Sequence, residues 1–230
     1  MKNVTDRTSN PFGMRPPCQY DCDGSGRRAV HGYGDANADL HLVGDHPGIH
    51  GGRETGVPFT GSTAGERLQP VLNEVGLLGD ADTESEAQRA SERPVVANLF
   101  LSYLYTCCLP EGRAPTETEY ANLERFFDAE LRAIAAHVLL PVGERATRHV
   151  LREYAAREAM LDEDGGMAAL HAEQLPGRGF LVVPIREPTE WEDGDREALT
   201  ESLTELLESD YYQIADLSRF LTGNEMYEVR

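Results

Sequence analysis

Short apolar runs alternate with helical stripes along most of the chain. Residues 40–43, 94–105, 138–142 and 180–185 form compact apolar runs of the kind that buried strands show. Between and after them, apolar side chains recur every three or four residues over 64–75, 120–134, 146–154 and 199–207, which is the spacing of amphipathic helices. Strands that alternate with helices form parallel sheets covered on both faces. We therefore expect an α/β fold of three αβα layers around a central four-stranded parallel sheet.

Two of the predicted helices carry start signals. Thr63 and Glu66, and again Thr116 and Glu119, have the S/T-x-x-E spacing of a capping box, in which side chains satisfy the free amides of the first turn. Pro70 falls inside the first of these helices and predicts a kink or a late start. Further helix is expected after the last stripe, as far as residue 221.

The chain is long enough for one substantial core, and we expect a single domain over residues 18–222. Residues 1–17 lack periodicity and contain three prolines, which predicts a flexible arm, and 223–230 form a tail. Residues 79–93 read as an acidic loop. No apolar run approaches the roughly 18 residues of a membrane helix, and the amino end lacks the apolar core of a secretory signal. These features predict a cytoplasmic protein that does not contact a membrane.

The chain is strongly acidic. It has 40 acidic against 21 basic residues, a net charge of -19, and Lys2 as its single lysine. Such a surface keeps a protein soluble and favours a monomer, and the scarcity of lysine is typical of a high-salt habitat. A nucleic-acid-binding protein normally shows a basic surface. At molar salt, however, attraction to phosphates is screened to within about 3 Å, so the charge does not exclude such a partner.

Polar residues follow the first apolar run directly. Residues 40–43 end in Gly44-Asp45-His46-Pro47-Gly48, and a glycine-rich loop with one aromatic residue, Phe59, comes next. Open α/β sheets bind ligands at the carboxyl ends of their strands. The sequence therefore predicts a ligand site at this loop.

Three segments of the chain resemble the uracil-DNA glycosylase superfamily, in its iron–sulfur (family 4) and related branches. GDHPGIHGGRETGVPFTGSTAGERL is similar to the first motif of that family, CLPEGRAPTETEYANLERFFDAEL to its cysteine-containing loop and helix, and VLLPVGERATRHVL to a strand-turn-helix. The positions that match the first motif are Gly44, Pro47, Gly48, Gly56, Pro58, Phe59, Gly61 and Gly65. The resemblance implies a DNA-binding domain that flips a damaged base into a pocket at the carboxyl ends of the strands.

The resemblance also implies roles for residues of the first motif. Gly44 and Gly48 match its backbone positions, and Phe59 matches the ring on which uracil stacks, the alternative being a core phenylalanine. Asp45 stands where the family has Glu and could position water, or it could cap nearby amides. His46 could donate to a base or a phosphate, or be a solvated loop histidine.

Other positions depart from the family pattern. Leu104 stands where an Asn reads the uracil edge, and a leucine cannot pair with a base. Glu187 replaces the His of the third motif, and an ionised Glu would oppose the charge on a departing base unless an apolar pocket kept it protonated. Arg186 could swing inward and supply positive charge, or pair with Glu187 or with a phosphate.

The cysteines match the ligand set of the family in part. The resemblance implies a 4Fe–4S cluster on four thiolates, and Cys18, Cys22 and Cys108 match three of them. The fourth position is Asn122, while Cys107 is an adjacent spare that should point to the opposite side of a strand. Alternatives are buried or free thiols in a reducing cytoplasm, or zinc on three cysteines and one further ligand.

A second metal site is conceivable in the first loop. His46 and His50 lie close to Asp45 along the chain, and these three residue types are metal ligands. The pattern alone does not decide between this and the other roles of the loop.

Two functions therefore stay open. In the first, the chain is a DNA repair glycosylase that flips a deaminated base, uracil or a related one, and excises it by hydrolysing the N-glycosidic bond with altered motif residues. In the second, it is a catalytically inactive protein of the same fold that binds nucleic acid or another protein. DNA is the partner that the resemblance implies.

Overall fold

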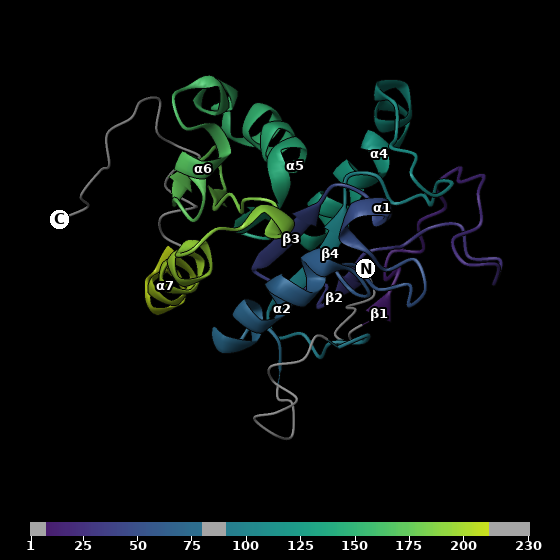
Figure 1. Cartoon of the computed structure of the whole chain (residues 1–230), viewed down its shortest axis with the longest axis horizontal. Helices are drawn as coiled ribbons and strands as arrows, with labels where there is room; N and C mark the ends of the chain where they lie inside the picture. Colours follow the sequence, from purple (N-terminus) through teal and green to yellow (C-terminus); the bar gives the residue numbers. More distant parts are fainter. Residues whose placement is uncertain (1–7, 80–90, 212–230) are drawn as a thin grey trace.

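The computed structural model describes residues 8–79 and 91–211, which fold around one sheet (Figure 1). The sheet has seven strands in the order β1-β2-β4-β3-β5-β7-β6. Their bounds are β1 Thr8–Ser9, β2 Tyr33–Gly34, β3 Leu40–Gly44, β4 Leu99–Tyr103, β5 Val138–Pro141, β6 Leu175–Pro176 and β7 Leu181–Val182. The central strands β4, β3, β5 and β7 are parallel, whereas β1, β2 and β6 are antiparallel to their neighbours.

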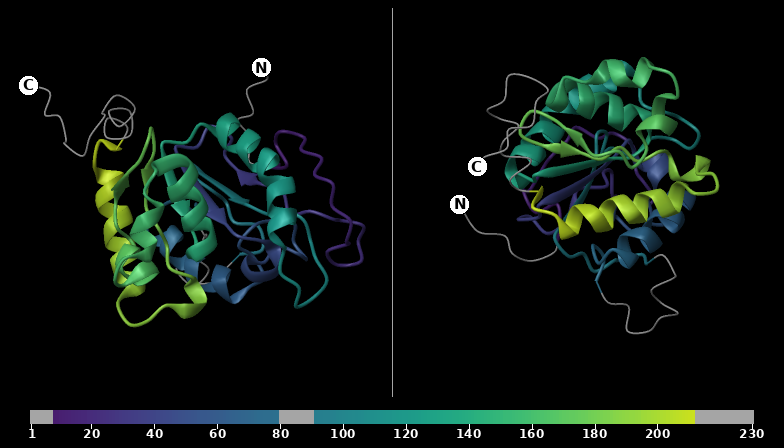
Figure 2. Two further views of the ribbon diagram at one scale, coloured as in Figure 1. Left: turned by 90° about the horizontal axis from the view of Figure 1, so that it is seen from above. Right: turned by 90° about the vertical axis from the view of Figure 1, so that its left-hand side faces the viewer.

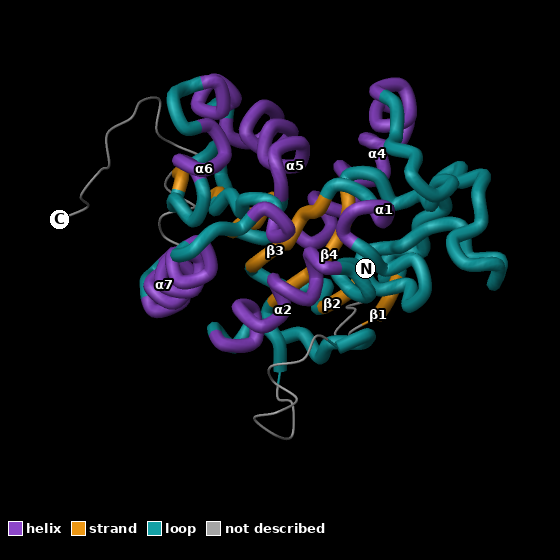
Figure 3. The backbone as a smooth tube through the Cα atoms, in the orientation of Figure 1, coloured by secondary structure: helices purple, strands orange, loops and turns teal. Residues whose placement is uncertain are grey.

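Helices cover both faces of the sheet, so the predicted αβα class is confirmed (Figures 2 and 3). Their bounds are α1 Pro47–His50, α2 Thr63–Glu74, α4 Glu117–Ile134, α5 Gly143–Val150, α6 Gly166–Leu170 and α7 Asp195–Glu208, with the shorter turns η1 Leu151–Ala155, η2 Glu158–Asp162 and η3 Pro188–Glu190. The prediction of four parallel strands describes only the centre of the sheet. The three antiparallel strands have two residues each, which is too short to leave a periodic pattern in the sequence.

The alternation of side chains along the strands divides the core between the two faces. Leu40 and Leu42 of β3 pack in one apolar cluster with residues of α2 and α7, whereas Val43 packs in another with residues of α4 and α5. Successive strand residues point to opposite faces, so one buried strand supplies both clusters. Figure 2 shows α2 and α7 on one side of the sheet and α4 and α5 on the other.

The predicted helix starts are right in one case and wrong in the other. Thr116 and Glu119 form the capping box of α4 as expected. The box predicted at Thr63 and Glu66 is wrong, because Ser62 caps α2 and accepts the Gly65 amide at 3.2 Å. A late start is excluded too, since α2 begins at Thr63 and continues through its internal proline.

Within the segment predicted to be an arm, Thr8–Ser9 pair with Tyr33–Gly34 at the edge of the sheet. The core of the predicted acidic loop, the helix expected up to residue 221 and the tail 223–230 lie outside the described residues, which end at 211. In the described parts of the chain, no helix combines the length and apolar character that crossing a membrane requires.

The parallel register brings the carboxyl ends of four strands to one edge. Gly44 lies beside Tyr103, Val43 beside Pro141, and Val142 forms a bridge with Ile185. The segments that follow these strands therefore meet at this edge, although they lie far apart in the sequence.

A buried polar chain crosses the core on the α4 side of the sheet. His41 Nε2 lies 2.7 Å from the Ser102 hydroxyl, which in turn hydrogen-bonds to Glu130 of α4. Burial raises the pKa of Glu130 to about 7, although the bond from Ser102 opposes the shift. Burial also lowers the pKa of His41 to about 3, so its ring is neutral at neutral pH.

This chain makes the free energy of unfolding depend on pH. Because the folded pKa of Glu130 lies above its ordinary value of 4.5, Glu130 contributes stability at low pH that is lost as the pH rises from about 4.5 through about 7, whereas His41, with its lowered pKa, contributes in the opposite direction. Relative to wild type, Glu130→Gln should therefore gain about 3 kcal/mol in the free energy of unfolding between pH 4 and pH 8, measured by urea unfolding. Glu201→Gln, on the exposed face of α7, should show no such gain, and a pH dependence of Glu130→Gln equal to that of wild type would contradict the assignment.

Candidate functional site

The loop after β3 begins with two buried polar residues. His46 caps α1, and its Nδ1 accepts the Gly48 amide at 3.0 Å. Burial lowers the pKa of His46, so the neutral ring carries its proton on Nε2. A Cβ on Gly48 would lie 2.7 Å from the His46 ring, so glycine permits this cap. The expectation of a solvated histidine is therefore wrong, and Nε2–H remains as a donor.

The Asp45 carboxylate turns toward α4. It is 9% exposed, and its Oδ1 accepts a hydrogen bond from the Tyr120 hydroxyl. Burial, together with the charge of Asp45 and the hydrogen bond to it, raises the pKa of Tyr120, which keeps the phenol protonated as the donor. The Arg145 guanidinium lies 4.2 Å from the centre of the Tyr120 ring. Asp45 is thus held by a side chain of another element, and the capping of nearby amides is not what fixes its carboxylate.

A histidine and a glutamate that are far apart in the sequence lie in contact at the carboxyl ends of the strands. His50 is fully buried, and its Nδ1 accepts the Asp45 amide at 2.9 Å. Its Nε2 lies 2.9 Å from Glu187 Oε2, a contact between residues 137 positions apart. Since Nδ1 is an acceptor, the ring proton sits on Nε2 and is donated to Glu187.

Glu187 is ionised in this environment. Burial by itself raises the pKa of Glu187, but the hydrogen bond from His50, together with bonds from Thr189, outweighs it and lowers the pKa. A protonated Glu187 in an apolar pocket, the condition under which it could replace the family histidine, is therefore not what the structure shows. The site carries negative charge at this position.

The possible metal site of His46, His50 and Asp45 is not formed. Both ring nitrogens of His50 are engaged, one by a backbone amide and one by Glu187. Across residues 8–79 and 91–211, no group of three or more His, Cys, Asp or Glu side chains is placed to hold a metal ion.

Phe59 lies in the core beneath the loop. Its ring is 1% exposed and stacks on His50 with centroids 5.1 Å apart and an interplanar angle of 25°. Tyr103 accepts the Phe59 amide at 2.7 Å and donates to the Gly51 carbonyl at 3.1 Å. A Cβ on Gly44 would lie 2.6–2.8 Å from the rings of His50, Phe59 and Tyr103, so only glycine fits there. Phe59 therefore occupies the core position that the sequence left open as an alternative, and neither face of its ring is free.

The remaining sequence candidates lie at the margins of the site. Leu104 is buried and lines a cleft of about 580 Å³ between α4 and α5, together with Tyr120 and Arg145. Arg186 binds Asp195 at 3.1 Å and Glu192 at 3.3 Å, so its guanidinium faces the start of α7. The expectation that Arg186 swings inward or pairs with Glu187 is wrong, because these two acids hold it outside.

A second cleft lies on the other side of the loop. It measures about 500 Å³ and is lined by α1 and the glycine-rich segment, including Pro47, Gly48, Ile49 and Ser62. Neither of these two clefts is lined by His50 or Glu187. In this conformation the pair is covered rather than open to a large ligand.

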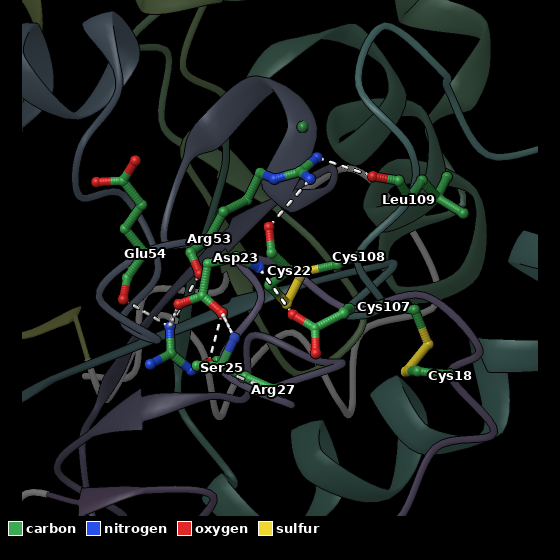
Figure 4. The surroundings of a disulfide bond; sticks show 12 residues. Cys18, Cys22, Asp23, Ser25, Arg27, Arg53, Glu54, Cys107, Cys108 and Leu109 are labelled. Atoms are coloured by element: carbon green, nitrogen blue, oxygen red, sulfur yellow. Dashed lines mark hydrogen bonds and ion pairs between the residues drawn. A yellow bond between two sulfur atoms is a disulfide. The ribbon is translucent and has the colours of Figure 1, made fainter.

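All four cysteines form disulfides (Figure 4). Cys18 is bonded to Cys107 and Cys22 to Cys108, with Cα atoms 5.2 and 5.1 Å apart. Cys107 is therefore not a spare, and the expectation of free thiols is wrong. The two neighbours do point apart as expected, since Cys107 and Cys108 belong to different apolar clusters.

The cysteines in this form do not fit an iron–sulfur cluster or zinc. Each sulfur is bonded to another sulfur, so none is available as a thiolate. Asn122, at the fourth family position, lines a cleft with Cys18 and Cys107. Arg53 ties the same segments together, because its guanidinium donates to the Cys22 carbonyl at 3.1 Å and the Leu109 carbonyl at 2.8 Å (Figure 4).

The fold and the site together define the class of protein. A sheet with four parallel central strands and polar groups gathered at their carboxyl ends is the arrangement of α/β proteins that bind ligands at that edge. Residues 31–206 match the family model of the uracil DNA glycosylase superfamily, so the chain belongs to that superfamily. The resemblance seen in the motifs is confirmed, and the family is one of DNA repair hydrolases that act in base excision.

Curated relatives carry the same family name. The chain is 28% identical over 194 residues to a type-5 uracil-DNA glycosylase of Pyrobaculum aerophilum, covering 84% of this chain and 80% of that protein. It is 30% identical over 133 residues to a type-5 enzyme of Thermus thermophilus, covering 57% and 58%. A type-4 uracil-DNA glycosylase of Saccharolobus solfataricus is 23% identical over 200 residues, covering 86% and 83%.

Two residues of the site escaped sequence reasoning in their present roles. His50 was considered only as a metal ligand, and Tyr120 only as part of the apolar stripe of α4. Nothing in the sequence pairs His50 with Glu187 or Tyr120 with Asp45, because each pair joins segments that only the parallel sheet brings together.

The disulfides predict a thiol count and a stability effect. Protein denatured without reductant should show no titratable thiol, and four after reduction. Replacing Cys22 and Cys108 together by Ala should lower the free energy of unfolding by about 2–5 kcal/mol, because the cross-link restricts a long loop of the unfolded chain. The difference in the free energy of unfolding between this variant and wild type should become smaller when both are unfolded in reductant, because wild type then loses its cross-links too. Four thiols before reduction, or stoichiometric iron in anaerobically purified protein, would contradict this pairing.

Proposed function

We propose that this chain is a DNA N-glycosylase that flips a deaminated base, uracil or a related one, out of DNA and hydrolyses its N-glycosidic bond. The observation that carries the proposal is the contact of 2.9 Å between His50 and Glu187 at the carboxyl edge of the sheet. Keeping a largely buried carboxylate ionised costs desolvation free energy, and such groups concentrate at functional sites. Membership of a base-excision family supports the same activity.

The groups at the edge suit the steps of this reaction. As the C1′–N bond breaks, its electron pair goes to the base and the sugar becomes positive. The Glu187 carboxylate offsets that positive charge, while Asp45, fixed by Tyr120, orients a water and takes its proton as the water oxygen bonds to C1′. His46 Nε2–H is a donor for the departing base, whose negative charge it stabilises.

The proposal includes a movement of the loop. Phe59 and His50 are buried against each other, so a flipped base can stack on Phe59 only after the loop between Gly44 and Gly61 shifts. Leu104 offers an apolar contact and no hydrogen bond to a base edge. We therefore infer a preference for deaminated bases in general rather than for uracil alone, with DNA bound by a monomer.

The burial of Phe59 and His50 against each other also favours a second function. If the aromatic stack stays closed, the protein binds nucleic acid or another protein through its surface and cleaves nothing. The covered His50–Glu187 pair and the leucine at position 104 are the observations on its side.

A panel of DNA duplexes with uracil, hypoxanthine or another deaminated base, assayed at molar salt, tests the first function. Wild type should release at least one free base. Asp45→Asn and Glu187→Gln should each lower the rate by about 10²-fold or more, because each removes a carboxylate that acts in the transition state. The measurement is the amount of free base against time by chromatography.

Two matched variants control this test. Asp128→Asn alters a carboxylate that accepts a tyrosine hydroxyl, that of Tyr154, away from the strand ends, and Glu190→Gln alters an exposed acid three positions from Glu187. Both should keep the wild-type rate. Absence of any release across the panel, with DNA binding intact, would exclude the first function and support the second.

A further inference from the structure

We propose that His50 is a positioning residue that fixes the Glu187 carboxylate at the strand-end site, so that an imidazole of the first loop governs the acid of the third motif. The inference rests on the proposed function and assigns a further residue to it.

The backbone of the loop sets the tautomer of His50. The Asp45 amide donates to Nδ1 at 2.9 Å, so the proton of the neutral ring is on Nε2. Nε2 lies 2.9 Å from Glu187 Oε2 and can only donate there. The peptide unit next to the Asp45 side chain therefore determines, through one ring, where the third-motif carboxylate is held.

Packing prevents the ring of His50 from turning away. Its imidazole is fully buried and stacks on Phe59, and the Tyr103 ring lies 6.1 Å away. The Ser62 hydroxyl donates to the His50 carbonyl at 2.9 Å, which anchors the end of α1. The ring is thus a rigid donor rather than a mobile one.

A glycine in the turn after β5, Gly143, leaves room for the Glu187 carboxylate. A Cβ on Gly143 would lie 3.1 Å from Glu187 Oε2, and the Gly143 φ of +80° is unfavourable for other residues. Oε2 accepts from His50 and Oε1 accepts a long bond of 3.4 Å from the Thr189 hydroxyl, while the Thr189 amide also donates to the carboxylate. The side chain of Glu187 is 18% exposed, so the carboxylate is held in place without being sealed from solvent.

The arginines around the pair are bound elsewhere. The titratable and charged residues on the elements around it include Asp45 and His46 of the loop, Glu66 and Arg67 of α2, Tyr103 of β4, Glu144 and Arg145 of α5, and Arg186 with His171, which accepts the Arg186 amide. Arg67 donates to the Pro188 carbonyl at 2.9 Å, Arg145 pairs with Glu117, and Arg186 pairs with Asp195. His50 is therefore the ring whose donor is directed at the Glu187 carboxylate.

Three variants separate the functions of the ring. His50→Gln keeps a donor at the position of Nε2, His50→Asn keeps only an acceptor for the Asp45 amide, and His50→Phe keeps only the ring on Phe59. The pKa of Glu187, followed by ¹³C NMR and assigned with Glu187→Gln, should rise in the Asn and Phe variants and least in the Gln variant, because burial then acts without the donor. An unchanged Glu187 pKa in the Asn and Phe variants would overturn the inference.

Base release gives an independent readout. In the Asn and Phe variants the acid limb of the pH–rate profile should move to higher pH by about one unit. At pH values below that limb kcat should be roughly tenfold lower than in wild type, with KM unchanged. The Gln variant should have a kcat close to that of wild type. In a Glu187→Gln background, His50→Asn should add no further loss, whereas a merely structural histidine would add its full effect there. If wild type releases no base, the proposed function fails, and the Glu187 titration still decides this inference.

Discussion

The parallel pairing of β4, β3, β5 and β7 is the constraint on which the site depends. Because these strands run the same way, their carboxyl ends lie at one edge, and residues 45, 104, 143 and 187 all follow strands that end there. The central strand β3 is buried along its whole length, so it leads into the loop from a rigid position. The close packing around Gly44 then fixes where the aromatic rings under that loop can lie.

An imidazole and a carboxylate face each other across this edge, and each comes from the motif in which the family pattern has the other. That pattern places an acid in the first motif and a histidine in the third. Here a histidine of the first loop, His50, meets an acid of the third motif, Glu187, while Asp45 keeps the acid of the first motif. Under the proposed function, the ionised Glu187 makes this position more negative than a histidine would, and His46 Nε2–H is the donor proposed for the departing base.

The amino-terminal segment is secured by a different kind of chemistry from that which the family resemblance implies. Disulfides with sequence separations of 89 and 86 join the segment around residues 18–22 to the residues after β4, and the Arg53 guanidinium bridges the same segments. Cross-links over such long loops restrict the unfolded chain strongly. They hold this segment to the domain in a protein whose net charge of -19 favours expansion through self-repulsion.

The sequence by itself determined the αβα class, the central strands, the capping box of α4 and the superfamily, because each of these leaves a local pattern of apolar spacing, start signals or motif residues. It also placed Asp45 and His46 in the loop after a strand, because the end of an apolar run shows where a strand stops, and it singled out Glu187 through the match to the third motif. It did not determine the two-residue edge strands, the pairing of the cysteines, the outward ion pairs of Arg186 or the burial of Phe59. Only the tertiary structure decided these, and with them the contact between His50 and Glu187, because a hydrogen bond between side chains 137 residues apart depends on strand order and register, which no local pattern specifies.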